Sequence, residues 1–363
     1  MSSIYLKSIA NYLKCWGIVP SYDFEKNILH HTPRYRVIPQ WSLMVICCLA
    51  TIFSARELLK RPYLFTTTGI ILNILSMIGI CCMILECSTM AQQWEHIFQQ
   101  VHHIENVLTP KVNAPNVFYK NPLFQFSLLN LCTLFAIFTS AFANGDSWMS
   151  APQYVYFYLT SLAFFLGISL LTTMKLKLKE LNGLFNMTSN FAVRSIIHCH
   201  DLFFKLLEIV ENFNSLFGRQ ILIRSLYDFG SILITALYLY CYRDGMPYLS
   251  RTHLEIMTLA RISSFAFIVI TLGMQFTVML CCDFVVRESE KLLVTCIDLQ
   301  RRFPLDSAEY RELQSFADTL TKRKISFSAA NFFKINRSAM FSMLGTTLTY
   351  FITSIQFIEK PNK

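Results

Sequence analysis

Charged residues are scarce in this sequence of 363 residues, since Asp, Glu, Lys and Arg together make up only 15% of it. Soluble domains carry about 25% of these residues on average. Hydrophobic residues make up 53% of the chain, and 32 residues are Phe. Several uncharged runs are longer than the helices of an ordinary soluble core. The composition therefore predicts an all-α, polytopic membrane protein.

The sequence also lacks the patterns of an enzyme or a metal site. It contains no His-Glu-x-x-His motif, and no paired acids or Ser/His pair falls at mid-membrane depth. The twelve cysteines form no Cys-x-x-Cys motif, and most of them lie inside hydrophobic runs, where Cys behaves as a small apolar residue. The first 20 residues lack the apolar core of a signal peptide. We therefore expect no enzyme activity, no metal and no cofactor.

Glycine and proline are few, with 11 of each, and they rarely interrupt the hydrophobic runs. Transporters typically show broken helices and similarity between the two halves of the chain. Neither feature is visible here. The sequence therefore disfavours a transporter.

Seven hydrophobic runs are long enough to cross a bilayer as helices. They lie at 37–55, 63–85, within 121–145, within 147–174, at 220–242, 262–282 and 338–358. Arg224 and Asp228 interrupt the fifth run at a spacing of four, and we expect them to pair within that helix near the membrane interface. The charged stretches 175–220 and 283–334 also have helical patterns, which predicts that helices extend beyond the membrane.

The distribution of Lys and Arg predicts the orientation. With the N-terminus inside, 22 of these cations face the cytoplasm and 7 face outside. They cluster beside hydrophobic runs, so we expect contacts with anionic lipids and none with nucleic acid. Seven spans with an internal N-terminus are the reverse of a G-protein-coupled receptor. The third span also lacks an acidic-Arg-aromatic triplet and the seventh lacks Asn-Pro-x-x-Tyr.

The last run has a polar face. Ser342, Thr346, Thr349, Thr353 and Gln356 follow at steps of four and three, which places them along one side of a helix. Such a seam either lines water or packs against another helix, because Ser and Thr can bond their own backbone carbonyls. An amide such as Gln356 has more hydrogen-bonding sites than a helix satisfies locally.

The same run carries a recognisable signature. Thr349-Tyr350, five mostly hydrophobic residues and then Gln356-Phe357 resemble the C-terminal signature of insect gustatory receptors. The preceding stretch, 330–337, is similar to that family as well, as are the chain length, the seven spans and the internal N-terminus. Sugar receptors of the family carry an acidic residue directly after Thr-Tyr, where this chain has Phe351. The resemblance therefore favours a tastant other than a sugar.

The resemblance implies a ligand-gated, nonselective cation channel in the plasma membrane, assembled as a homotetramer or with other gustatory receptors. It divides the chain into a ligand-binding bundle (1–282), a cytoplasmic anchor (283–335) and a pore helix with a short outer tail (336–363). The expected pore and gate residues are Thr346, Thr349, Tyr350, Thr353, Gln356 and Phe357. An odorant-receptor-type channel subunit and a metabotropic seven-helix receptor are the alternatives.

A small-molecule tastant is expected to bind among the outer halves of the first six spans. Aromatic walls with a few polar groups suit such a ligand, although Tyr is also common at membrane interfaces regardless of function. Arg261 has a second interpretation, because a long cationic side chain can also reach outer lipid headgroups. The candidate residues are Asn73, Ser140, Tyr154, Tyr158, Ser161, Tyr238, Tyr242, Arg261 and Ser264.

Overall fold

The computed structural model describes most of the chain from residue 63 onward and parts of the first 62 residues. The described residues are 2–15, 18–20, 22–23, 28–29, 42, 45, 48–49, 52, 63–108, 127, 130–131, 133–134, 137, 151–187, 193–241 and 251–359. The first and third expected spans, 37–55 and 121–145, lie almost entirely outside them.

The other five expected spans all form helices. These helices are α3 (Tyr63–Thr89), α6 (Ala151–Met187), α7 (Val193–Cys241), α8 (Arg251–Gln300) and α10 (Arg337–Glu359). Each helix contains the uncharged run that predicted it, except for a few residues at the ends of some runs. The prediction of a mainly helical chain is therefore confirmed for the described residues.

Three described segments are long and apolar enough to cross a membrane: Gln153–Phe185, Val193–Leu237 and Ser264–Gln300. The pair Ile70–Glu86 and Ala91–Ile104, bent by 67°, is a fourth candidate among the residues that were described. Helix α10 is not in this set although it has 23 residues. Its Ser, Thr and Gln residues lower its hydropathy, which is unfavourable for a helix surrounded by lipid on every side.

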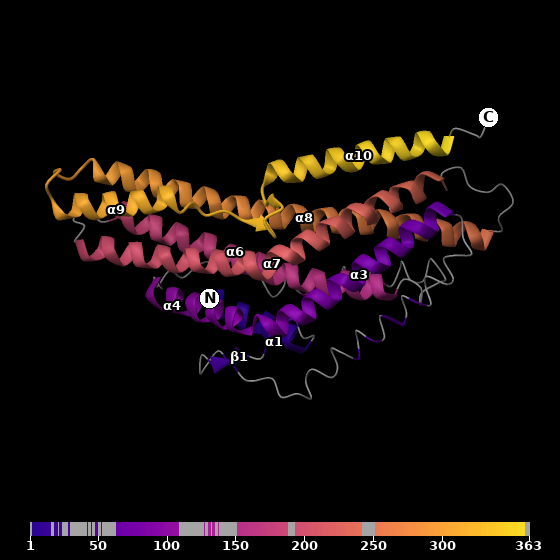
Figure 1. The fold of residues 1–363 in the computed structure, drawn as a ribbon, viewed down its shortest axis with the longest axis horizontal. Helices are drawn as coiled ribbons and strands as arrows, with labels where there is room; N and C mark the ends of the chain where they lie inside the picture. Colours follow the sequence, from indigo (N-terminus) through magenta and orange to yellow (C-terminus); the bar gives the residue numbers. More distant parts are fainter. Residues whose placement is uncertain are drawn as a thin grey trace.

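The central helices are much longer than a bilayer requires. Helix α7 has 49 residues, which at about 1.5 Å per residue is about 74 Å, against roughly 30 Å of hydrocarbon. Helices α6 and α8 are similarly extended, and all three run side by side along the molecule (Figure 1). The charged stretch 175–220 is thus mostly helical, as its pattern predicted.

The chain after the second span also contains a helix, α4 (Ala91–Leu108), which was not predicted from the sequence. Its buried side chains include Trp94, Ile97, Phe98 and Val101, which are spaced for one helical face. They pack on α7, and Trp94 meets Phe217 edge-on with ring centroids 5.5 Å apart. Ten polar residues in the same helix obscured this amphipathic pattern.

At the N-terminus, α1 (Ser2–Cys15) packs against α6, with Ile9 and Leu13 buried. A two-stranded antiparallel sheet follows, formed by β1 (Tyr22–Asp23) and β2 (Ile28–Leu29). The basic N-terminal arm is therefore partly folded onto the bundle.

The stretch between α8 and α10 contains α9 (Ala308–Lys322). The Ser307 hydroxyl caps this helix by accepting a hydrogen bond from the Tyr310 backbone N–H at 3.1 Å. Leu313 and Phe316 lie on its buried face, which packs on α7 and α8. Figure 1 shows α9 beside α8 at one end of the molecule and α10 along the other half.

A hairpin connects α9 to α10. Its strands are β3 (Ser328–Ala329) and β4 (Phe333–Lys334), which pair antiparallel. Ala330 and Asn331 between them have positive φ angles of 49° and 63°, an uncommon backbone for residues other than glycine. The expected boundary between ligand bundle and anchor, at 282/283, falls inside the continuous helix α8.

Candidate functional site

Helix α10 lies along the outside of the bundle and contacts α7 and α8 (Figure 1). Its inner face is formed by Met340, Met343, Leu344 and Thr347, which are buried or half-buried. The helix begins at Asn336, whose side-chain oxygen accepts a hydrogen bond from the Ala339 backbone N–H at 2.9 Å. One apolar face therefore holds α10 against its own chain.

The polar seam lies on the opposite, exposed side of α10. Thr346, Thr349, Thr353 and Gln356 are all exposed, and each threonine hydroxyl donates to the backbone carbonyl four residues earlier. The seam therefore does not pack against another helix of the described chain. Phe357 at the end of the seam is 77% exposed.

Two aromatic pairs attach the C-terminal half of α10 to α7. The Tyr350 ring stands perpendicular to Phe229 with centroids 5.9 Å apart, and Phe351 stands perpendicular to Tyr240 at 6.5 Å. Edge-to-face aromatic pairs each contribute about 0.5–1.5 kcal/mol beyond area burial. Tyr350 thus contacts α7, and its expected role in the pore or gate stays a prediction.

The N-terminal end of α10 is attached to α8 by charge. Arg337 Nε lies 2.8 Å from Asp283 Oδ2, and Arg287 Nε lies 3.0 Å from the same carboxylate. The Arg337 guanidinium also lies over the Phe284 ring at 5.6 Å from its centroid. These contacts fix the beginning of α10 relative to α8.

Behind α10, an ion pair is enclosed in the bundle. Arg224 Nε lies 2.7 Å from Asp228 Oδ1, and the two side chains are only 1% and 4% exposed. The expected pairing within the fifth span is confirmed. Neighbouring helices enclose both side chains, and the expected position near the membrane interface stays a prediction.

This ion pair connects three helices. From α6, the Phe157 carbonyl and the Thr160 hydroxyl accept hydrogen bonds from Arg224, and the guanidinium lies 4.6 Å from the Phe157 ring centroid. From α8, the Gln275 amide donates to Asp228 Oδ2 at 2.7 Å. A buried ion pair with several hydrogen bonds favours one arrangement of its helices, since any other arrangement leaves a charge unpaired.

The sequence analysis did not select Thr160 or Gln275 as members of this network. The signal that could have found them was the pair Arg224 and Asp228 itself, because two charges in an apolar helix need polar partners on neighbouring helices. The sequence does not say which neighbours supply them.

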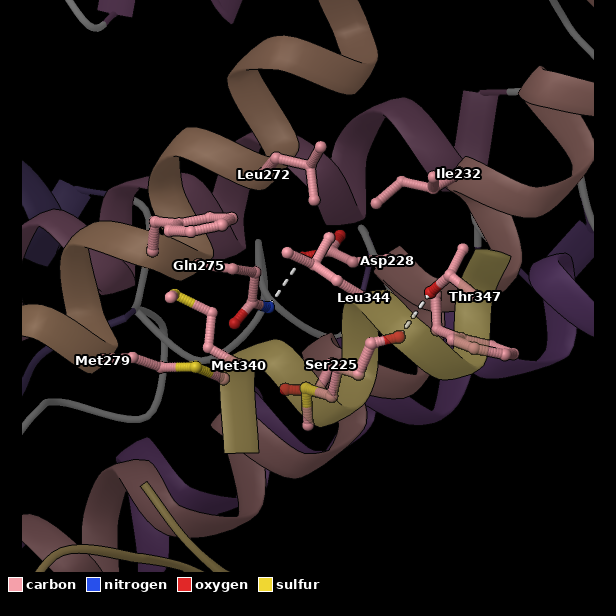
Figure 2. A pocket seen from close by; sticks show the side chains of 12 residues that line it. Ser225, Asp228, Ile232, Leu272, Gln275, Met279, Met340, Leu344 and Thr347 are labelled. Carbon is pink, nitrogen blue, oxygen red and sulfur yellow. Dashed lines mark hydrogen bonds between the residues drawn. The ribbon is translucent and has the colours of Figure 1, made fainter. Parts of the chain in front are cut away.

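A cavity of about 50 Å³ separates this network from the inner face of α10. Figure 2 shows its lining side chains, which come from α7, α8 and α10. Most are apolar, with three methionines among them, and the polar ones are Ser225, Asp228, Gln275 and Thr347. The cavity was not anticipated from the sequence.

The structure places some of the expected ligand residues where helices meet. Asn73 of α3 is buried, and its side-chain oxygen accepts a hydrogen bond from Gln153 of α6 at 3.0 Å. Tyr154 follows directly in α6 and is half-buried. These residues form one polar junction between α3 and α6.

Two further α6 candidates already have hydrogen-bond partners. The Tyr158 hydroxyl lies 2.8 Å from the Tyr12 hydroxyl of α1, and Ser161 donates to the Phe157 carbonyl at 2.6 Å. Both residues are buried. Their role as ligand contacts stays a prediction.

The remaining candidates are less fully placed. Arg261 and Ser264 are half-buried on α8, and Tyr238 lies on α7, where only its backbone is described. Ser140 and Tyr242 lie outside the described residues. Within the part of the chain that the structure describes, no three His, Cys, Asp or Glu side chains are grouped closely enough to hold a metal ion.

Comparisons with known proteins identify similar chains. A family model described as 7tm chemosensory receptor matches residues 6–360. The solved structure of the insect olfactory receptor OR5 from Machilis hrabei is similar at 15% identity with a TM-score of 0.67, and 98% of each chain is covered. The structure of that receptor in complex with eugenol matches at 16% identity with a TM-score of 0.68, again over 98% of both chains. A search of curated protein sequences gives no significant match.

Proposed function

Because the chain belongs to the 7tm chemosensory receptor family, whose members are multi-pass receptors and not enzymes, we propose that it is a gustatory receptor. It acts as a ligand-gated, nonselective cation channel of the plasma membrane. Its ligand is a small organic tastant other than a sugar. One observation carries the proposal: the polar seam of α10 lies on the side of the helix turned away from its own chain.

In the proposed channel, four copies of α10 surround a central pore. The apolar face of each copy stays on its own α7 and α8, and the seam faces the water between the copies. Threonine oxygens in the seam keep free lone pairs after donating to the backbone, so they can accept hydrogen bonds from water and contact cations. The seam holds no acidic residue, which supports weak selectivity among cations.

The proposed gate lies at the outer end of α10. The Phe357 side chain is not covered by its own chain, and four such rings close a narrow pore by excluding water. Gln356, one residue earlier, supplies amide oxygens that replace part of an ion's hydration shell. The internal N-terminus inferred from the cations places this end outside the cell.

Ligand binding has to move α10 in order to open this gate. The aromatic pairs of Tyr350 and Phe351 with α7 attach its outer half, and the Arg337–Asp283 ion pair attaches its inner end. A ligand at the α3–α6 junction of Asn73 and Tyr154 acts on α7 through the Arg224 network. A ligand shifts this equilibrium by as much as its affinities for the two states differ.

The signature in α10 supports a gustatory receptor, and Phe351 after Thr-Tyr supports a ligand other than a sugar. A second candidate function is an odorant receptor, because the similar solved structures are of an olfactory receptor and one of them contains eugenol. Both functions use the same channel architecture and differ in the ligand.

The test is to express this chain alone in cells and to record whole-cell currents while three sets of ligands are applied. These are non-sugar tastants, sugars, and eugenol with related volatiles. We expect cation currents with non-sugar tastants and no currents with sugars. Currents evoked only by eugenol and related volatiles favour the odorant receptor. Currents that depend on intracellular GTP contradict the proposal that this chain is itself a ligand-gated channel, and they favour a metabotropic receptor.

A further inference from the structure

Besides Asp228 Oδ1, which lies 2.7 Å from Arg224 Nε, two side-chain atoms of residues lining the cavity behind α10 have no hydrogen-bond partner in the described part of the chain. These are the Ser225 hydroxyl of α7 and the Gln275 side-chain oxygen of α8. Both residues line the cavity and are more than nine-tenths buried, with 7% and 9% exposure. Burial without a partner is unfavourable for a polar atom, so the cavity favours an occupant that bonds them.

The geometry of Gln275 defines what such an occupant must offer. Its amide nitrogen donates to Asp228, and Figure 2 shows the amide oxygen pointing away from that carboxylate. The oxygen therefore needs a donor from the occupant. The Ser225 hydroxyl both donates and accepts, so a single alcohol oxygen satisfies both residues: its O–H donates to Gln275, and its lone pair accepts from Ser225.

Charge and size restrict the occupant further. Arg224 balances the charge of Asp228, and the described residues that line the cavity include no other charged side chain, so a neutral molecule fits better than an ion. An engineered cavity of roughly 150 Å³ holds one benzene, so about 50 Å³ has room for roughly two or three heavy atoms. The three methionines in the wall are flexible and adapt to small differences in shape.

We propose that this cavity is a binding site for a short-chain alcohol of ethanol size, separate from the tastant site expected among the outer halves of the first six spans. The alcohol's hydroxyl bonds Gln275 and Ser225, and its carbon atoms contact the methionines and Leu344 of α10. Occupancy adds contacts between α10 and the α7–α8 pair and so stabilises the docked position of α10. The proposal rests on the geometry of this cavity and does not depend on the ligand or ion selectivity of the channel.

The test uses the purified full chain in lipid nanodiscs and measures saturation transfer from the protein to ethanol by NMR. We expect a saturable signal with a Kd no tighter than about millimolar, because each heavy atom contributes only limited binding energy. Dimethyl ether, an isomer of ethanol without an O–H donor, is the matched control ligand. Its saturable signal should be at least fivefold weaker.

Two variants provide the protein controls. Ser225→Leu fills the cavity without touching the Arg224–Asp228–Gln275 bonds and should reduce the saturable ethanol signal at least tenfold. Thr277→Leu makes the same kind of change at an exposed position of α8, where the hydroxyl bonds only its own helix, and should leave the signal unchanged. Thermal unfolding of both variants checks that they fold.

Each alternative result overturns the proposal. The absence of a saturable signal means that the cavity holds water only. If dimethyl ether gives the same saturable signal as ethanol, the hydroxyl group is not recognised. If Ser225→Leu gives the same ethanol signal as the unmodified chain, ethanol binds at another site. Stronger binding of 1-hexanol, lost in Ser225→Leu, shows that the cavity takes a lipid-like chain.

Discussion

At the scale of single residues, the most consequential feature is a pair of charges enclosed in an apolar bundle. Arg224 and Asp228 bond each other, and two further helices supply hydrogen bonds to them. Removing one partner leaves the other buried and charged. Replacing both by apolar residues leaves no uncompensated charge.

This difference predicts the outcome of two substitutions. Arg224→Met should destabilise the folded chain by about 3–5 kcal/mol, because it leaves Asp228 buried with only Gln275 as partner. The double variant Arg224→Met, Asp228→Leu should recover most of that loss. Chemical unfolding of the detergent-solubilised chain, followed by the fluorescence of its tryptophans, measures both. Equal losses in the single and double variants would show that the pairing contributes little.

At the scale of elements, the hairpin before α10 is positioned by close contact with α7. A Cβ built on Gly218 would lie 2.9 Å from the Ser328 carbonyl oxygen and 3.0 Å from the Ala330 backbone nitrogen. Asn214, one turn earlier, bonds the same segment through both side-chain atoms, to the Ser326 carbonyl and the Ser328 N–H. The glycine lets the hairpin lie directly on the helix.

Two glycine substitutions test this contact. Gly218→Ala should destabilise the chain by about 1–3 kcal/mol, because backbone atoms and not flexible side chains block the new methyl group. Gly183→Ala is the control, since a Cβ there has no neighbour within 4 Å and alanine favours a helix by about 1 kcal/mol. Melting temperatures of the two variants should move in opposite directions. A neutral Gly218→Ala would mean that the hairpin is not held against α7.

Helix α10 itself carries the prediction for the gate. Phe357→Ala should raise the current measured without ligand, because a smaller ring of side chains admits water. Gln356→Ala should change conductance or ion preference more than ligand sensitivity. Phe265→Ala, at an exposed position of α8, is the control and should leave the current without ligand unchanged. The gate lies elsewhere if both α10 substitutions shift only the ligand dose response.

At the scale of the whole molecule, the apolar side chains left uncovered by the chain indicate how copies assemble. Large exposed hydrophobic side chains occur beyond α8 and around the hairpin, including Leu305 and Phe332, the latter 79% exposed. Exposed apolar groups of this kind often mark interaction sites. They lie in the stretch 283–334, which we propose as the anchor shared between subunits.

The anchor predicts an effect on assembly without an effect on folding. Deleting α9 would disturb the chain's own core, because Leu313 and Phe316 are buried within it. Phe332→Ser changes only an exposed side chain and should shift the oligomer towards smaller species on native gels. Leu184→Ser, exposed on α6 outside this stretch, is the control. An unchanged oligomer in Phe332→Ser would exclude this contact from the interface.

The predicted orientation of the whole chain rests on 22 cations on one side against 7 on the other. Epitope tags on intact cells should be detected at the C-terminus and not at the N-terminus. Permeabilised cells, in which both tags become accessible, are the control. Surface detection of the N-terminal tag would reverse the model of the pore and its outer gate.

Much of this architecture could be predicted without a structure, because it depends on local patterns. Uncharged runs predicted five helices that the structure describes, and the steps of four and three predicted that Thr346, Thr349 and Thr353 share a face. The helix α4 was also present in the periodicity of Trp94 and Phe98, although its many polar residues concealed it. These features need only neighbouring residues of one helix.

The sequence by itself thus determined a helical membrane chain, the long central helices and the polar seam of its last helix. Only the tertiary structure decided that the side chains of this seam are exposed, that Arg224 is buried, and that a cavity lies behind Leu344. Thr160 and Gln275 stand 64 and 47 residues from their partners in α7. Periodicity places a side chain on a face of its own helix, whereas the neighbours of that face depend on how distant helices pack.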